Sequence, residues 1–428
     1  MTPDRTRWCE LLVGLERVEV LDVVRQHDRL VVTIESTDRL VGCSVCGTRA
    51  KLKDRDRVEL ADLPAFGCPV TLVWSKRRWR CGDPDCEVGT WTEDRPDIAP
   101  ARATMTRRAG LWATIQVGRH LHSVSWAAKE LGVTWHTVMD AVILWGNALV
   151  TDPDRVGTTT AIGVDETSFL SATATERTRW VSSICDVAGR IVIDMIEGRQ
   201  APDLDRWLAE RPQEWIDAVA ITVCDLHEPF RAALARHLPD AIAVADPFHV
   251  VAVGTRCVDA TRRRTQNDTL GHRGRKGDPL YRCRKLLAMA EERLDEAGSD
   301  RLRGLLAAGD PLGHVHEAWR AKECLRDLYT LYGEHELAGR WIDGLIEDCR
   351  DADAKEVRGM ARTLKRWRDQ ILAWHTTGAS NGPTEGLNSI IKKVKRVGAG
   401  FRSFANYRLR ILLAVGGCNW SLLDPAPR

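Results

Sequence analysis

The 428-residue sequence predicts an α/β core that is interrupted by an all-α region and preceded by two small domains. Three features support this prediction: paired cysteines near the N-terminus, short apolar runs between residues 158 and 250, and a helix-like stretch rich in Leu, Ala and Arg after residue 255. Hydrophobic residues make up 44% of the chain, which excludes a disordered or fibrous protein. The net charge of +2 means that local basic patches, rather than a global field, must bind any polyanion.

Four of the thirteen cysteines form two close pairs, Cys43 with Cys46 and Cys81 with Cys86. Each pair can direct two thiolates at one ion, and two pairs complete the tetrahedral shell that zinc prefers. Strand-like runs at Val18–Val24, Leu30–Ile34 and Val70–Trp74 surround the cysteines. We therefore predict a zinc ribbon within residues 1–95, with four unrelated buried cysteines as the alternative.

Basic residues precede the second cysteine pair and are candidates for contacts with DNA phosphates: Lys76, Arg77 and Arg78. An aromatic residue, Trp79, lies beside them. The alternative interpretation is a solvated strand edge.

Residues 100–150 have the helical period, and residues 123–139 have the pattern of a helix-turn-helix. Ala127 is small enough for two helices to cross closely, Gly132 lies in the turn, and Thr134 is well placed as the N-cap of the second helix. That helix would present Trp135 and His136 to a DNA major groove. A plain helical hairpin is the alternative.

Apolar runs in residues 155–254 predict the core sheet. The first three runs follow closely and favour an antiparallel meander, whereas the last two are each preceded by a helix-like stretch and favour parallel pairing. The resulting order, β-β-β-α-β-α-β, is that of a ribonuclease H-like fold. The five runs are Ala161–Val164, Trp180–Ile184, Ile191–Ile196, Ala218–Val223 and Ala241–Ala245.

Carboxylates stand where these strands end. Asp165 is at or near the end of the first strand and Asp225 follows the fourth, so neighbouring strands would bring both to one edge of the sheet. Glu385 begins a later helix and completes a candidate catalytic set that binds Mg²⁺. Asp246 and His249, just after the fifth strand, could support the site or form a structural contact, and Asp246 is the alternative second aspartate.

The helix that carries Glu385 has two distinct faces. Glu385, Asn388, Lys392 and Lys395 share one face, and the other is apolar. Seven Lys or Arg and no acidic residue lie between positions 388 and 410. We predict that Lys392, Lys395 and Arg396 contact DNA, with Asn388 and Lys392 also supporting the catalytic set.

The helical stretch of residues 255–375 has a local surplus of basic residues at its start. Ten Lys or Arg stand against three Asp between positions 256 and 285. Three consecutive arginines, Arg262, Arg263 and Arg264, are therefore candidate contacts with the DNA backbone.

The combination of these motifs along nearly the whole chain resembles the ISL-three family of bacterial insertion-sequence transposases. The resemblance rests on the zinc ribbon, the helix-turn-helix, Gly163-Val-Asp-Glu166, Asp225, Asp246-x-x-His249 and Thr384-Glu-Gly-x-Asn388. It implies a DDE transposase whose ribonuclease H-like core uses Asp165, Asp225 and Glu385 with two Mg²⁺ or Mn²⁺ ions. Such an enzyme binds terminal inverted repeats, then cleaves DNA and transfers strands by in-line attack.

The domain organisation expected from this resemblance has five parts. They are a zinc-ribbon domain (1–95), a helix-turn-helix domain (100–150), the first part of the core (155–254), a helical insertion (255–375) and the last part of the core with the Glu helix (376–428). We expect double-stranded DNA, both transposon ends and target, as the partner, and a homodimer or larger assembly on DNA. A zinc-containing DNA-binding regulator and a ribonuclease H-type nuclease without strand transfer are the competing interpretations.

The termini and the longest apolar stretch predict a cytoplasmic protein. The N-terminus carries charges where a signal peptide needs an apolar core, and the stretch Ile411–Leu423 is shorter than the roughly 20 residues of a membrane-spanning helix.

Overall fold

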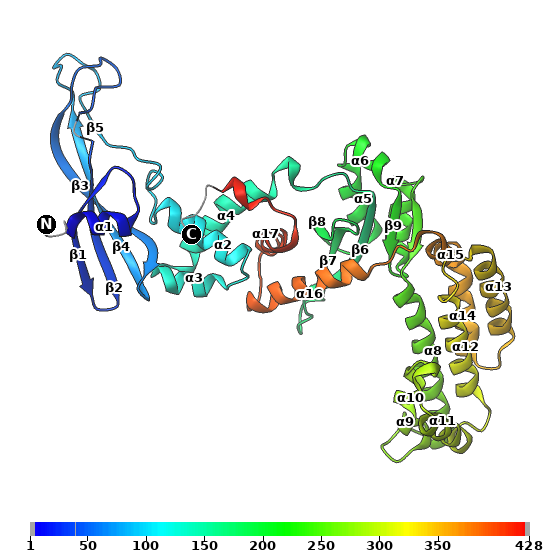
Figure 1. The fold of residues 1–428 in the computed structure, drawn as a ribbon. Helices are drawn as coiled ribbons and strands as arrows, with labels where there is room; N and C mark the ends of the chain where they lie inside the picture. Colours follow the sequence, from blue (N-terminus) through cyan, green and yellow to red (C-terminus); the bar gives the residue numbers. More distant parts are fainter. Residues whose placement is uncertain (1–4, 39, 424–428) are drawn as a thin grey trace. The chain divides into compact units, whose positions relative to one another are not determined.

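The computed structural model describes residues 5–38 and 40–423, which form two compact units (Figure 1). The first unit joins the N-terminal 156 residues to the segment from residue 390 onward, and the second comprises residues 157–389. No helix among the described residues is both long and apolar enough to cross a membrane.

A twisted sheet forms the N-terminal part of the first unit. Its strand order is β1-β2-β4-β3, and β5 pairs with the C-terminal end of β4. Ile34, Leu72 and Trp74 are fully buried at the centre of its core. The elements are α1 (Arg5–Val13), β1 (Val18–Gln26), β2 (Arg29–Ser36), β3 (Lys51–Ala65), β4 (Cys68–Arg80) and β5 (Thr90–Thr92).

Strand β3 was not predicted from the sequence, because its first half is almost entirely charged and exposed. It forms through backbone pairing with β4, which begins opposite the end of β3 at Ala65 and Cys68. Backbone hydrogen bonds need no apolar side chain, so a long hairpin can contain a strand without an apolar pattern.

Four helices form the rest of the first unit: α2 (Arg107–Gly118), α3 (Val124–Leu131), α4 (Trp135–Val150) and α17 (Phe404–Val415). Gly132 ends α3 in the left-handed conformation (φ 65°), which glycine adopts without strain. Thr134 caps α4 by accepting a hydrogen bond from the Thr137 backbone N–H, as predicted. Ala127 and Val138 are fully buried, so the turn between α3 and α4 is held by packing on both sides.

The second unit contains a mixed five-stranded sheet of order β10-β9-β6-β7-β8 (Figure 1). Strands β6, β7 and β8 are antiparallel, whereas β9 and β10 run parallel to β6, which confirms the predicted meander and the two parallel additions. The elements are β6 (Ala161–Leu170), β7 (Arg179–Asp186), β8 (Ile191–Glu197), α5 (Ala201–Ala209), α6 (Gln213–Ala218), β9 (Ile221–Cys224), α7 (Glu228–His237) and β10 (Ile242–Ala245).

The stretch that follows β10 is helical, as predicted. Its longest helix, α8 (Pro247–Leu270), packs along α12 and α14. The other helices are α9 (Pro279–Arg282), α10 (Arg284–Ala288), α11 (Glu296–Gly309), α12 (His314–Leu328), α13 (His335–Asp351), α14 (Lys355–Arg366) and α15 (Arg368–Thr377). Short 3₁₀ turns cover Pro153–Arg155, Glu291–Arg293 and Trp420–Leu422.

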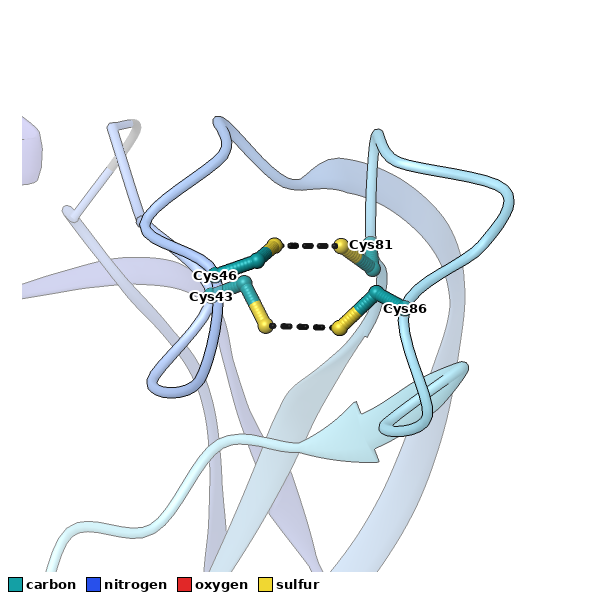
Figure 2. Close-up of side chains that lie close together, drawn as sticks. All are labelled: Cys43, Cys46, Cys81 and Cys86. Atoms are coloured by element: carbon teal, nitrogen blue, oxygen red, sulfur yellow. Dashed lines mark hydrogen bonds between the residues drawn. The ribbon is translucent and has the colours of Figure 1, made fainter.

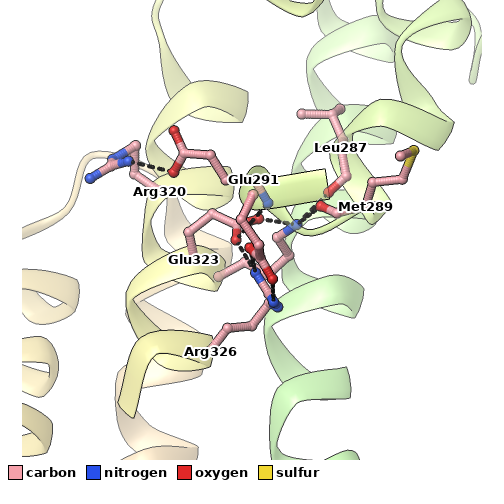
Figure 3. Close-up of polar contacts among 8 residues, drawn as sticks. Leu287, Met289, Glu291, Arg320, Glu323 and Arg326 are labelled. Carbon is pink, nitrogen blue, oxygen red and sulfur yellow. Dashed lines mark hydrogen bonds and ion pairs between the residues drawn. The ribbon is translucent and has the colours of Figure 1, made fainter. Parts of the chain in front are cut away.

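A buried ionic cluster joins α12 to the end of α10 and the segment after it (Figure 3). Lys322, almost fully buried, donates to the carbonyl oxygens of Leu287 and Met289 at 2.8 and 2.7 Å. Glu323 accepts from Arg326 at 2.6 Å and lies 2.5 Å from Lys322 Nζ. Every buried charge therefore has a partner, which is the condition for such a cluster to stabilise a helix pair.

One expectation about an element boundary is wrong. Strand β6 continues to Leu170, so Asp165 lies within it rather than at its end. The last part of the chain forms two helices, α16 (Gly382–Val397) and α17, separated by a turn in which Gly400 has a φ of 108°.

Candidate functional site

Three aspartates line one edge of the mixed sheet in register. The last paired residues of β6 and β9 are Val164 and Cys224, and β10 ends its pairing with β9 at Ala245. Asp165, Asp225 and Asp246 each follow directly after these residues. Because adjacent strands lie about 4.8 Å apart, the sheet itself gathers the three carboxylates. Asp165 thus stands where β6 loses its parallel neighbour, although β6 continues along β7.

The electrostatics of this edge are those of a site with excess negative charge. Burial, together with the charges of Asp165 and Asp246, raises the pKa of Asp225 to about 8. Burial also raises the pKa of Asp165. Carboxylates held this close cannot all ionise at low cost unless a cation joins them.

The start of α16 lies against these carboxylates. Asn388 is buried and donates from Nδ2 to Asp165 Oδ2. Asn381 donates from its backbone N–H to Asp246 Oδ1 at 2.7 Å and from Nδ2 to Asp225 Oδ1 at 3.4 Å. The role of Asn381 was not predicted from the sequence; an amide just before a carboxylate-bearing helix was the available signal.

His249 links the second aspartate to the helix carboxylate. Its Nδ1 lies 3.1 Å from Asp225 Oδ2 and its Nε2 lies 3.8 Å from Glu385 Oε1. Ligand atoms of Asp246, His249 and Glu385 lie within 4.8 Å of one another, close enough to share a cation. The structure therefore places Asp225, Asp246, His249 and Glu385 in one cluster, and Asn388 connects Asp165 to the helix that carries Glu385.

Asp246 differs from Asp225 in what its oxygens do. It is 2% exposed and caps α8, with Oδ2 accepting from the His249 backbone N–H at 3.3 Å and Oδ1 accepting from Asn381. Both oxygens of Asp246 thus accept hydrogen bonds from backbone N–H groups, which gives this residue a structural role. The oxygens of Asp225 contact only side chains, which can rearrange around an ion.

The donor set fits a hard divalent cation such as Mg²⁺. Carboxylate and amide oxygens are its preferred protein ligands. Asn388 Oδ1 is buried and has no hydrogen-bond partner among the described residues.

The four paired cysteines meet at the tip of the N-terminal sheet (Figure 2). Cys43 Sγ lies 3.7 Å from Cys86 Sγ, and Cys46 Sγ lies 3.4 Å from Cys81 Sγ. A tetrahedral zinc with bonds of about 2.3 Å requires sulfur–sulfur separations of about 3.8 Å. Hydrogen bonds from Thr48 also lower the pKa of Cys46 to about 6, which favours the metal-binding thiolate. The cluster is therefore a Cys₄ site suited to structural zinc.

The basic residues on β4 contact acidic or aromatic side chains. Arg77 is buried and donates from Nε to Glu35 Oε1 at 2.6 Å, which is a structural role. Arg78 lies 3.5 Å from Asp54, and Lys76 lies over the Trp74 ring at 4.2 Å. The structure thus argues against a phosphate contact by Arg77.

The three consecutive arginines on α8 have different surroundings. Arg262 is 5% exposed and donates to Asp259 and Gln266, which places it inside the helical region. Arg264 is half-buried and donates to Glu356 at 2.9 Å. Only Arg263 is exposed, and it pairs with Asp259 at 2.7 Å. Arg262 and Arg264 therefore stabilise helix packing rather than face a polyanion.

The remaining predicted DNA contacts are more accessible. Trp135 is 42% exposed at the start of α4, with His136 exposed beside it. Lys392 and Arg396 are exposed on α16, and Lys395 is half-buried. Lys392 lies two turns after Glu385 along the helix.

Comparisons with known proteins match two segments of the chain, the one with the paired cysteines and the one with the mixed sheet. A family model described as "Transposase" (DDE_Tnp_ISL3) matches residues 162–411, and one described as a zinc-finger of transposase IS204/IS1001/IS1096/IS1165 matches residues 39–86. The transposase for insertion sequence element IS1001 of Bordetella parapertussis is 25% identical over 94% of this chain and 95% of its own length. The transposase for insertion sequence element IS1557 of Mycobacterium tuberculosis is 28% identical over 58% of this chain and 59% of its own length.

Proposed function

Because the chain belongs to the ISL3 family of insertion-sequence transposases, we propose that it cuts and joins DNA at a site formed by Asp165, Asp225 and Glu385. The observation that carries this assignment is the meeting of the three elements that hold these carboxylates. Strands β6 and β9 are paired up to the residues before Asp165 and Asp225. Asn388 on α16 contacts Asp165, and Asn381, the residue just before α16, contacts Asp225.

The mixed sheet supports a ribonuclease H-like core. If the five strands of this sheet are numbered along the chain, their order in the sheet is 5-4-1-2-3. The first strand, β6, and the fourth, β9, therefore lie side by side. In such an arrangement, one carboxylate from each central strand and one from a later helix can share a metal pair. The helices from α8 to α15 would then be an insertion between the last strand and the Glu helix.

In this proposal, Asp165, Asp225 and Glu385 hold two Mg²⁺ or Mn²⁺ ions. When bound, these ions supply activation of the attacking water or 3′-hydroxyl and stabilisation of the leaving oxygen. Asn388 holds Asp165 in place, Asn381 holds the Asp225 side chain, and His249 spans Asp225 and Glu385. Asp246 is a positioning residue that fixes the start of α8 and the turn before α16.

The proposed domain assignment keeps the expected boundaries, although the segment from residue 390 onward belongs to the first compact unit. Residues 1–95 would form the zinc-ribbon domain, 100–150 a helix-turn-helix domain, 155–254 and 376–428 the two parts of the core, and 255–375 the insertion. Buried Ala127 and Val138, the Gly132 turn and exposed Trp135 and His136 support the helix-turn-helix assignment.

The full chain is expected to cleave and join duplexes that carry the inverted repeats flanking its gene, in the presence of Mg²⁺. A pre-cut end tests strand transfer separately from cleavage. Cleavage without joining would favour a nuclease, and binding without either reaction would favour a DNA-binding regulator.

Replacing Trp135 and His136 together with alanine is expected to remove the preference for terminal repeats over scrambled DNA of equal length. The change deletes two exposed side chains from the first turn of α4, where they would contact bases, and removes no Lys or Arg. Fluorescence anisotropy at one fixed salt concentration measures both affinities. A retained preference would contradict the assignment of α4 as the reading helix.

Replacing Gly163 with alanine is expected to lower cleavage by roughly a hundredfold, because small displacements in an active site are costly. A Cβ at Gly163 would lie 2.5 Å from Thr384 Oγ1 and 2.7 Å from Asn381 Oδ1, so the start of α16 must move off the sheet. Gly344→Ala is the matched control, since nothing lies within 4 Å of its Cβ position. Full activity of Gly163→Ala would show that this close approach does not position Glu385.

A further inference from the structure

A cavity of about 400 Å³ in the first unit lies between the start of α3, the start of α4 and the segment that joins α16 to α17. Its lining includes Ser123, Trp135, Arg402, Ser403 and Arg410. Two of these residues are helix N-caps: Ser123 begins α3 and Ser403 begins α17. Trp135 is the first residue of α4, so three helix N-termini border one cavity.

These N-termini are capped by neutral hydroxyl groups, and no acidic side chain of the cavity lining offsets their positive potential. The first turn of each of the three helices contains no acidic residue, and no acidic residue lines the cavity. Helix N-termini present free backbone N–H groups and the positive end of the helix dipole, and both favour an anion.

Arg410 is part of the cavity lining and contributes a full positive charge to it. It is 3% exposed, and its Nη2 donates to the His122 carbonyl oxygen at 3.1 Å. Its Nε has no hydrogen-bond partner among the described residues, and no carboxylate is paired with it there. Burial lowers the pKa of Arg410 to about 10, so the group stays protonated at neutral pH.

A buried guanidinium without a counter-ion is unfavourable unless an anion joins it. Arg402 lines the same cavity and is exposed, and no ion pair holds it within the described chain. The cavity therefore combines two arginines and three helix N-termini, with one wall formed by Trp135 at the start of the helix proposed to read DNA.

We propose that this cavity binds one backbone phosphate of the bound DNA, held by Arg402 and Arg410 and by the first turns of α3 and α17. The choice of DNA as the source of the phosphate rests on the proposed function. A phosphate fixed here would set the orientation of α4 on the duplex, because backbone contacts position a reading helix without carrying sequence information.

The test uses the full chain and a duplex with a terminal repeat. Arg410→Gln and Arg402→Gln are each expected to weaken binding about ten- to hundredfold for repeat and scrambled DNA alike. Each should also reduce the slope of log affinity against log salt concentration by about one. Arg410→Lys keeps the charge and should keep the slope. Arg119→Gln, an exposed arginine outside the cavity, is the matched control and should lose less than either.

A neutral methylphosphonate scanned along the duplex then identifies the phosphate. One position should weaken binding of the unmodified protein and have a clearly smaller effect in the Arg402→Gln protein, which keeps the buried Arg410 and so its fold. Equal losses in both proteins at every position would overturn the proposal, as would variants that bind with the unmodified slope.

A DNA-free measurement separates this proposal from the proposed function. Inorganic phosphate, compared with chloride at equal ionic strength, should raise the melting temperature of the full chain and raise it less in Arg410→Gln. If phosphate binds here while DNA affinity is unchanged by both arginine variants, the cavity is a small-anion site and its assignment to DNA is wrong. If the chain has no end preference but the variants still lose affinity and slope, the phosphate site stands and the reading function of α4 fails.

Discussion

Asp165→Asn, Asp225→Asn and Glu385→Gln are each expected to lower DNA cleavage and joining by at least about a thousandfold, because each removes a charge that a metal pair requires. The substitutions keep side-chain shape. In Asp165→Asn a single oxygen remains to accept from both Asn388 and the Glu166 backbone N–H, so this variant tests both metal binding and the contact to α16. Gel assays on a pre-cut and an uncut duplex end measure the two reactions separately.

Binding to terminal repeats should persist in all three variants, since the proposed binding surfaces lie in the first unit. Glu197→Gln is the matched control: it removes a carboxylate from the same sheet, on β8, where Glu197 pairs with Arg179 at the surface. Mn²⁺ should replace Mg²⁺ in the unmodified protein, whereas Ca²⁺, with its looser geometry, should support binding without reaction. Activity within tenfold of the unmodified protein in any of the three would remove that residue from the set.

Asp246→Asn decides between the two possible second aspartates. We expect a smaller loss than in Asp225→Asn, because the amide keeps one oxygen to accept from a backbone N–H. If Asp246→Asn abolished the reaction while Asp225→Asn remained active, the set would be Asp165, Asp246 and Glu385. The cluster of Asp246, His249 and Glu385 would then be the metal site itself.

Removal of zinc is the second change with a large expected effect. Structural zinc contributes on the order of 10 kcal/mol to small zinc domains, so Cys43→Ser should reduce bound zinc from one per chain to near zero. The effect should be local. The core of the N-terminal sheet, with Ile34, Leu72 and Trp74, does not include the cysteine tip and should survive.

Hydrogen exchange of the full chain can distinguish local unfolding of the cysteine turns from loss of the whole N-terminal sheet. The turns at residues 43–49 and 81–89 should lose protection in Cys43→Ser, while β2 and the first half of β4 keep theirs. Cys68→Ser is the matched control, because Cys68 is as buried as Cys43 but lies outside the cluster. A protected tip without bound metal would contradict a structural role for zinc.

Much of the molecule could be predicted from local sequence patterns. The paired cysteines predicted the Cys₄ site, because a turn that directs two thiolates at one metal ion is encoded within a few residues. Short apolar runs predicted the order of β6 to β10, since burial on both faces of a strand requires consecutive apolar side chains. Aspartates directly after such runs predicted an acidic sheet edge, because parallel strands end together.

Charged side chains were the least predictable, because their roles depend on partners far away in the chain. Arg77 and Arg262 belong to basic runs that suggest phosphate binding, yet Glu35 and Asp259 neutralise them inside the structure. Arg410 belongs to a similar run and is buried without a carboxylate. Each of the three has another basic residue within two positions of the sequence, and only packing separates an ion pair from a charge that still needs a counter-ion.

The sequence by itself determined which residues follow the apolar strand runs, begin helices and form ligand turns, because those positions follow from the pattern of a few neighbouring residues. Only the tertiary structure decided what these residues contact. Asn381 and Asn388 reach Asp225 and Asp165 across more than 150 positions of the chain, and Gly163 leaves the space in which α16 meets the sheet. Such contacts depend on side-chain volume and direction in a packed interior, which no single segment specifies.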